Sequence, residues 1–187
     1  MWFRKFIIAA LLAVFSVSVS FTSDYQIEYQ YPVIEKALQL EQKGTLKQKD
    51  NGYLYVEVSR DYIAEILPLI DAPGNLVPPR HCTSKNGIGP HISVIYENEL
   101  IDNEIWEIKE LGQEFTFSVI NLRTVKVNTD GKMKKLWLLA VSCPELENLR
   151  THYGLSPKLK GHDFHITICT QVPGKPSISE VEIPDAA

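Results

Sequence analysis

The sequence contains few cysteines and none of the residue spacings that bind metals. Among 187 residues only Cys82, Cys143 and Cys169 are cysteines, and neither a C-x-x-C pair nor a carboxylate–histidine metal motif occurs. An odd number of cysteines leaves at least one thiol unpaired, so at most one disulfide is expected. We therefore expect no metal and no other cofactor, and we assign the cysteines a structural role.

The sequence also lacks an apolar run of the length of an ordinary membrane span, which takes about 20 residues. The one candidate lies at the start, where Arg4 and Lys5 precede an apolar segment from Phe6 to Val19 that ends in small residues. This order of basic, apolar and small residues is typical of a secretory signal peptide. We expect residues 1–20 to be a signal peptide and the mature protein to be secreted or periplasmic, without stable membrane insertion. An uncleaved signal anchor is the alternative.

An excess of positive charge is missing as well. Residues 1–20 carry two positive charges and no negative one, so the mature chain has 17 Lys+Arg against 23 Asp+Glu, a net charge of −6. Binding of long nucleic acid through its phosphates depends on many lysine and arginine side chains. A long nucleic acid is therefore not an expected partner, whereas a small phosphorylated ligand in a local pocket is compatible with this charge.

The composition is that of an ordinary globular chain, with 44% hydrophobic and 22% charged residues and no low-complexity segment. The length suits one domain, or one domain built from two similar halves. We predict a helical lead-in over residues 21–52, with its helix over 32–43, a two-lobed domain over 53–175 and a tail over 176–187. The protein is expected to be a monomer.

The order strand, helix, loop, strand occurs twice along the chain. Alternating apolar residues predict strands over 53–58 and 136–142, and each is followed by a segment with helical spacing. A shift of 83 residues places Val58 on Val141, and the strands that end the two repeats are 74 residues apart. We predict an α+β fold with two pseudo-symmetric lobes, each a mainly antiparallel sheet with a covering helix. An active-site cleft lies between them.

Each repeat ends in a strand that opens with a histidine and has a hydroxyl residue two positions later: HISVIY from His91 and HITICT from His165. Residues i and i+2 of a strand share a face, so Ser93 lies beside His91 and Thr167 beside His165. With five histidines, about 0.6 His-x-Ser/Thr triplets arise by chance, so either motif alone is weak evidence for a site. The stronger evidence is that both motifs occupy the same position in the two repeats.

The chemistry of these residue types suits a phosphodiester. Two imidazoles that face each other provide a general base for water and a general acid for the departing oxygen near neutral pH. Hydroxyl groups donate hydrogen bonds to the phosphate oxygens, on which charge builds up in the transition state. The two motifs therefore predict a metal-free phosphodiester site.

The motifs resemble those of the two-histidine (2H) phosphoesterase superfamily, which includes RNA 2′,3′-cyclic phosphodiesterases, also called 2′-5′ RNA ligases. That superfamily has two H-x-[ST] motifs in two symmetric lobes, and the segments KLWLLAV and LENLRTHYG are similar to the region before its second motif. The resemblance covers Tyr53 to Gln171. It implies that His91 and His165 are the acid/base pair and that Ser93 and Thr167 bind the phosphate. It also implies a substrate with a cyclic phosphate, a 2′-5′ linkage or a short oligonucleotide diester.

Other polar residues near the motifs are weaker candidates. Tyr53 and Tyr55 share one strand face, where they stack on a base or merely cover the sheet. Basic residues ahead of the motif strands line the mouth of the cleft or are ordinary solvated charges: Arg80, Lys85, Lys158 and Lys160. His81 and His152 are expected at the surface.

Two alternative functions stay open from the sequence. The first is a module of the same fold that holds a nucleotide or phosphorylated ligand without turning it over. The second is a metal-dependent exported hydrolase that uses His91, His162 and His165 as ligands.

Overall fold

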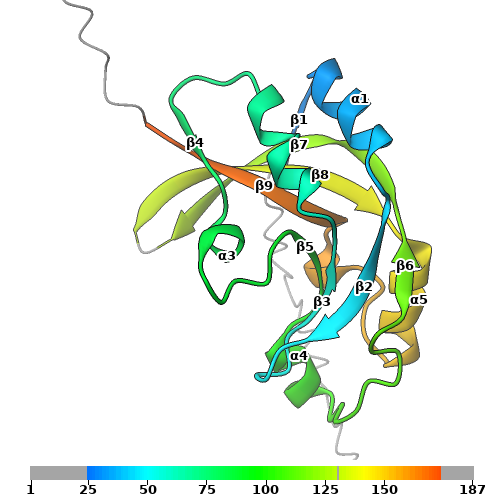
Figure 1. Cartoon of the computed structure of the whole chain (residues 1–187). Helices are drawn as coiled ribbons and strands as arrows, with labels where there is room; N and C mark the ends of the chain where they lie inside the picture. Colours follow the sequence, from blue (N-terminus) through cyan, green and yellow to red (C-terminus); the bar gives the residue numbers. More distant parts are fainter. Residues whose placement is uncertain (1–24, 130, 174–187) are drawn as a thin grey trace, which may run out of the picture.

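The computed structural model describes residues 25–129 and 131–173, which form a strongly curved sheet with helices packed against it (Figure 1). The expected signal peptide and the tail over 176–187 lie outside the described residues. In the described part of the chain, no helix is long and apolar enough to cross a membrane. The elements follow in this order: β1 (Gln26–Glu28), α1 (Tyr31–Gln39), β2 (Lys43–Gln48), β3 (Leu54–Glu57), α2 (Asp61–Ala64), η1 (Leu67–Leu69), β4 (Asn75–Val77), α3 (Arg80–Thr83), β5 (His91–Ile95), α4 (Glu97–Asp102), β6 (Glu114–Thr116), β7 (Ser118–Thr129), β8 (Lys132–Ser142), α5 (Pro144–His152), η2 (Leu159–Gly161) and β9 (Phe164–Val172).

The strands form one antiparallel sheet, and the fold is α+β as predicted. Its order is β1-β7-β8-β9-β5-β3-β2-β6, and β4 pairs with β9 beside this path. The order is symmetric about the middle, because β8 and β3 flank the central pair, followed by β7 and β2. The pairing register repeats as well: Val56 lies opposite Ile92, and Leu139 lies opposite Ile166. The repeat found in the sequence thus recurs as a repeat of strand pairing within one sheet.

The two halves of the sheet meet where β5 pairs with β9. Their register joins Ile92 to Ile166, and both side chains have 0% exposure. Along both strands buried residues alternate with half-buried ones, since Val94 and Ile168 point to the same side as the two paired isoleucines. One face of the central strands therefore belongs to the core, and the other is left for polar side chains.

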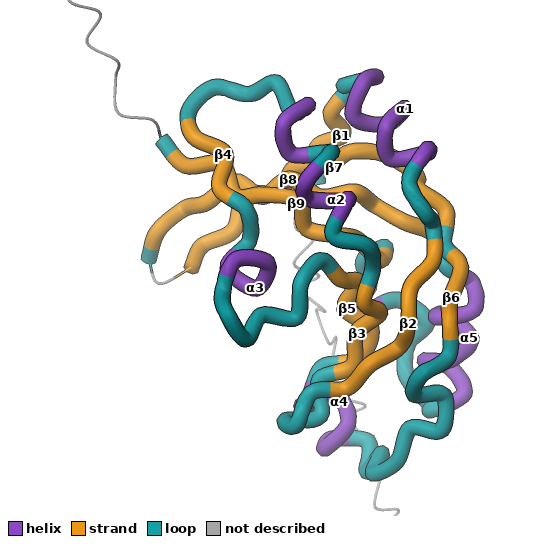
Figure 2. The backbone as a smooth tube through the Cα atoms, viewed as in Figure 1, coloured by secondary structure: helices purple, strands orange, loops and turns teal. Residues whose placement is uncertain are grey.

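Figure 2 shows α2 close to β9 and α5 beside β6. Helix α2, which follows β3, contacts β9, whereas α5, which follows β8, contacts β5 and β6. Pro144 occupies the first turn of α5, where its missing amide hydrogen costs nothing, and Gly154 with φ 75° ends it. Tyr62, Ile66 and Leu146 are fully buried beneath these segments. Each half thus contributes a helix to the core of the other.

The prediction of a helix up to Lys43 is wrong, because the end of the lead-in joins the sheet. Helix α1 ends at Gln39, and residues 43–48 form β2, in which Gly44 and Leu46 are buried. A Cβ atom at Gly44 would lie 2.3 Å from the carbonyl oxygen of Glu57, so the close approach of β2 to β3 requires glycine there. This strand order places β2 beside β3 as the counterpart of β7.

Two elements take their form from the fold. The helix after β3 ends at Ala64 and continues only as the short η1, because Pro68 lacks the amide hydrogen that a longer helix needs. The strand β7 runs from Ser118 to Thr129. Its register shifts between Val119 and Asn121, where a bulge keeps the strand continuous.

Arg150 is a buried charge that ties α5 to α4 and β5. Its side chain is 1% exposed and donates hydrogen bonds to the carbonyl oxygens of Ser156 at 2.7 Å and Val94 at 2.6 Å. It also pairs with the carboxylate of Glu99 at 2.7 Å, which in turn accepts a hydrogen bond from the amide of Tyr96. The guanidinium therefore holds the end of β5 in place directly after Ser93.

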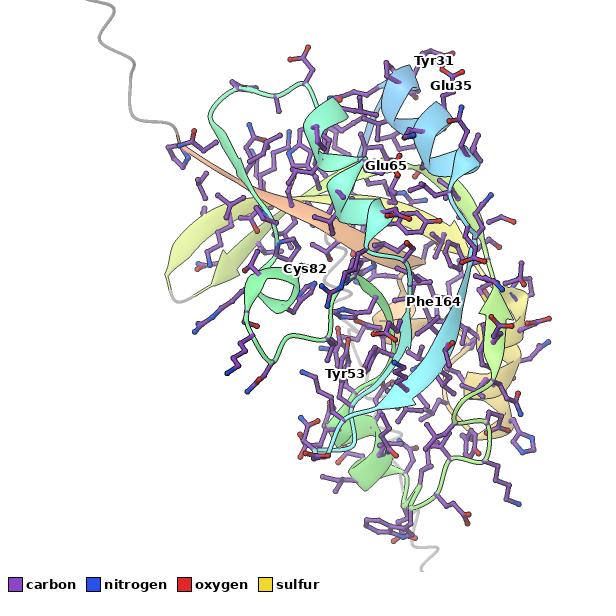
Figure 3. The ribbon with its side chains drawn as sticks, in the orientation of Figure 1. Tyr31, Glu35, Tyr53, Glu65, Cys82 and Phe164 are labelled. Atoms are coloured by element: carbon purple, nitrogen blue, oxygen red, sulfur yellow. The ribbon has the colours of Figure 1, made fainter. Side chains whose placement is uncertain are left out.

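Replacing Arg150 with methionine is expected to lower the free energy of unfolding by about 3–5 kcal/mol, because Glu99 then loses its charged partner. Urea denaturation followed by circular dichroism measures the change. Lys36→Met is the matched control, because Lys36 of α1 pairs with Glu65, which is labelled in Figure 3. The side chains of this pair are 35% and 40% exposed. The expected cost of Lys36→Met is below about 1 kcal/mol. Equal losses in both variants would contradict a structural role of the buried pair.

Candidate functional site

The four motif residues lie together on the polar face of the central strand pair. The antiparallel register between β5 and β9 joins Ile92 to Ile166. Continued by one residue in each direction, such a register sets His91 towards Thr167 and Ser93 towards His165. All four side chains are half-buried and share the face away from the core. Side chains directly opposite each other start from Cβ atoms about 4.5–5.5 Å apart. Each imidazole therefore lies beside its own strand's hydroxyl group and faces the hydroxyl group of the other repeat.

The two histidines are diagonal neighbours across the same pair of strands. Diagonal neighbours in a sheet are typically about 7–8 Å apart, with their Cβ atoms somewhat closer. A positive charge on His165 is the smallest of the influences that lower the pKa of His91, after burial and the charges of His81 and Lys49.

Both imidazole rings are held by the backbone in the same way. Nδ1 of His91 lies 2.8 Å from the carbonyl oxygen of Gly89, and Nδ1 of His165 lies 3.2 Å from that of Asp163. A carbonyl oxygen only accepts hydrogen bonds, so Nδ1 carries the proton in both rings. The lone pair of the neutral ring is therefore on Nε2. Each motif thus includes the residue two positions before its histidine.

Both imidazoles are poor at holding a second proton in the free protein. Burial lowers the pKa of His91 to about 4, against the hydrogen bond to Gly89, and positive charges on His81, Lys49 and His165 add to the lowering. Burial also lowers the pKa of His165, helped by positive charge on His162 and Arg123. Near neutral pH both rings are therefore neutral and available as bases.

Three stacked tyrosines form a wall beside His91. Tyr53 lies between Tyr55 and Tyr96, with ring centroids 5.8 Å apart on both sides and planes within 17° and 16° of parallel. The hydroxyl oxygen of Tyr53 is 2.6 Å from that of Ser93, and the Tyr55 ring meets His91 edge-on at 5.6 Å. Burial raises the pKa of Tyr53 to about 12, so its hydroxyl keeps its proton. Figure 3 shows Tyr53 at the start of β3.

His81 is the site residue that sequence reasoning missed. It was expected at the surface, but α3 folds back so that its ring is half-buried and 4.5 Å from the ring of His91. The amide of Gly89 donates a hydrogen bond to the His81 carbonyl at 2.9 Å, which closes this loop. Lys85 is exposed, and the lysine whose charge acts on His91 is Lys49. In the sequence, the only indication of the contact between His81 and His91 was that His81 lies shortly before the first motif.

A small cavity opens between Ser93 and His165. Its volume is about 120 Å³, and its other walls include Tyr96, Lys160 and His162. The wall also contains Asp163, whose carboxylate pairs with Arg123 at 2.9 Å and with Lys158. The cavity lining is mixed: Leu159, Phe164 and two tyrosines contribute apolar surface, and Lys160, Asp163 and the histidines contribute charged and polar groups.

The described side chains do not form the alternative metal site of His91, His162 and His165. Within residues 25–129 and 131–173, no three His, Cys, Asp or Glu side chains are close enough together to hold a metal ion. His162 instead meets the ring of Tyr25 edge-on at 5.3 Å. The three cysteines are free thiols, and Cys143 and Cys169 are buried. The set of His91, His162 and His165 therefore does not form a metal centre.

The ring nitrogens of His91 are expected to show a neutral imidazole with its proton on Nδ1 at pH 6, because its pKa lies near 4 rather than at the ordinary 6.5. Long-range ¹H–¹⁵N spectra over pH 4–8 measure this, and the His91→Asn variant assigns the signals. The unfolded chain takes up this proton below pH 6.5, so the contribution of His91 to stability is complete above pH 6.5 and is lost towards pH 4. A titration midpoint at or above 6.5 would contradict the buried, neutral ring.

Comparison with known proteins agrees with this geometry. A family model described as "Swiss Army Knife, 2H phosphoesterase domain" matches residues 54–172, more than half of the chain. No curated protein and no solved structure matches. The matched range begins with β3 and ends with β9, so it includes both motif strands and all four motif residues. The chain belongs to the 2H phosphoesterase superfamily.

Proposed function

We propose that the protein hydrolyses a phosphodiester of a small nucleotide or short RNA without a metal, with His91 and His165 as its acid/base pair. The family is generally one of phosphodiesterases and acts on small nucleotide or RNA substrates. The observation that supports the proposal is the pairing of Ile92 with Ile166, because the residues on either side of this pair are the two histidines, Ser93 and Thr167. A cyclic phosphate, a 2′-5′ linkage and a short oligonucleotide diester all fit this chemistry.

The proposed reaction is a displacement at phosphorus. The Nε2 lone pair of one imidazole takes a proton from water as the water oxygen forms a bond to phosphorus. The bond from phosphorus to the departing oxygen breaks, and the other imidazole, in its protonated form, gives its proton to that oxygen. For a 2′,3′-cyclic phosphate the products are a phosphate monoester and one free ribose hydroxyl group.

The hydroxyl groups and the charge of the substrate complete the site. Ser93 and Thr167 donate hydrogen bonds to the non-bridging phosphate oxygens, on which negative charge builds up. Because both rings are neutral in the free protein, the acid acquires its proton when an anionic phosphate binds and raises its pKa. We propose that the two halves of the sheet act as two lobes, one on each side of the bound phosphate.

Substitution of either histidine by alanine is expected to lower kcat/KM by about 10²–10⁴-fold, the usual contribution of general acid or base catalysis. Hydrolysis is assayed with nucleoside 2′,3′-cyclic monophosphates, 2′-5′ oligoadenylates and cyclic dinucleotides, with EDTA present. His152→Ala is the matched control, because His152 is exposed on α5, and it is expected to keep full activity.

Three results would refute the mechanism. Activity that survives the double substitution His91→Ala and His165→Ala would exclude the histidine pair as the catalyst. A nucleotide that binds intact and yields no product after long incubation would show a binding module of the same fold instead. Activity that is lost in EDTA and restored by zinc would also contradict a metal-free reaction.

We further propose that the protein is exported and that residues 1–20 are removed, on the basis of the order of basic, apolar and small residues there. The N-terminus of protein recovered outside the cytoplasm is expected to be Phe21, as measured by intact-mass and peptide mass spectrometry. Membrane-bound protein that retains Met1 would show the uncleaved anchor instead.

A further inference from the structure

Lys160 has a place in the site that the proposed reaction does not use. It belongs to η2, directly before β9, and it lines the 120 Å³ cavity together with Ser93 and His165. An ammonium group in this wall lies next to the position proposed for the scissile phosphate. The reaction itself requires only the imidazoles and hydroxyl groups of the two motifs.

The backbone of Lys160 is in a conformation that disfavours lysine. Its φ and ψ angles are 51° and 29°, in the left-handed region that glycine and asparagine adopt more readily. Gly161, which follows, also has a positive φ of 77°. Strained residues of this kind cluster at functional sites, where their surroundings hold them in place. The strained backbone therefore indicates that the side chain of Lys160 has a role.

The side chain of Lys160 is directed by an aromatic ring rather than by an acid. Its Nζ atom is 4.6 Å from the centroid of the Tyr96 ring. Tyr96 is also stacked on Tyr53, so Lys160 contacts the end of the tyrosine wall. Among the described residues, no carboxylate is within ion-pair distance of Lys160. The charge of Lys160 acts on the Glu99 carboxylate, but Glu99 pairs with Arg150. A cation held over an aromatic face keeps its charge available to an anion.

The other charges around the cavity add to its positive potential. The only carboxylate in its wall, within the described chain, is that of Asp163, and two cations already pair with it, Arg123 and Lys158. This positive cluster stands out in a chain whose formal net charge is −4. A local concentration of one sign of charge in a cavity attracts a ligand group of the opposite sign.

The cavity has the size of a single ligand group. Its volume is about 120 Å³. Pockets that enclose a whole small ligand measure about 300–1,000 Å³. A phosphate therefore suits this space, whereas a nucleobase with its sugar does not.

We infer that Lys160 binds a second phosphate of the substrate, in the cavity next to the scissile diester, and so makes the enzyme selective for nucleotides that carry a phosphate besides the one attacked. This inference rests on the proposed function and names a substrate class within it. Lys160 is then a specificity-determining residue, while the chemistry stays with the two histidines.

The test compares two substrates that differ by one phosphate: adenosine 2′,3′-cyclic phosphate, and the same nucleotide with an added 5′-phosphate. The native enzyme is expected to favour the second by about tenfold or more in kcat/KM, mainly through KM, as one charge-assisted contact provides. Lys160→Asn is expected to reduce this ratio to about one. Lys109→Asn removes the same charge from an exposed loop position and is expected to leave the ratio unchanged.

Asparagine tolerates the left-handed backbone better than lysine, so the Lys160→Asn variant is expected to melt at the same temperature or higher. A loss of selectivity without a loss of stability therefore reports on the side chain alone. An equal fall of kcat/KM for both substrates, or a native enzyme that does not distinguish them, would overturn the inference.

Binding without turnover separates the inference from the proposed function. Calorimetry measures the dissociation constants of adenosine 2′-phosphate and adenosine 2′,5′-bisphosphate. Tighter binding of the bisphosphate that disappears in Lys160→Asn supports the second phosphate site, even if no substrate is hydrolysed. Equal affinities of the native protein for the two nucleotides would overturn it, even if hydrolysis were observed.

Discussion

The antiparallel pairing of β5 with β9 at Ile92 and Ile166 is the constraint on which the site depends. It joins residues that occupy equivalent positions in the two repeats, so each motif meets the other in reverse order. A slip by one residue would turn the histidines into the core and the isoleucines towards the substrate. Val56 and Leu139, buried on the neighbouring strands, continue the same apolar row and oppose such a slip.

The polar face is rigid because the buried side of the sheet and the strand ends support it. The hydrogen bond from Arg150 to the carbonyl oxygen of Val94 fixes the backbone one residue after Ser93. Glu99, paired with the same guanidinium, holds the amide of Tyr96, and Tyr96 in turn is stacked on Tyr53. A buried ion pair on the core side and an aromatic wall on the polar side thus position the same strand. Catalysis by preorganised groups benefits from this rigidity.

The electrostatics of the site contrast with those of the chain. A negatively charged protein surrounds its two imidazoles with Lys49, Arg123 and Lys160, and burial lowers the pKa of both rings. Both rings are therefore neutral near neutral pH, and a bound anion would favour the protonated form of one ring. Under the proposed function, the same cations favour a small phosphorylated ligand and the acidic remainder of the chain disfavours a long polyanion.

The spacing of apolar residues along the sequence was sufficient to predict the motif strands and the repeat. It also predicted that each histidine shares a strand face with its hydroxyl residue, because strand periodicity depends on neighbouring residues. The same information did not predict that residues 43–48 form a strand, since β2 exists only through its pairing with β3 and β6. It also placed His81 at the surface. The contacts of His81 with His91 and of Lys160 with Tyr96 join segments that loops bring together. Loop geometry follows from packing over the whole fold, and for this reason the surroundings of the two motifs emerged only with the folded chain.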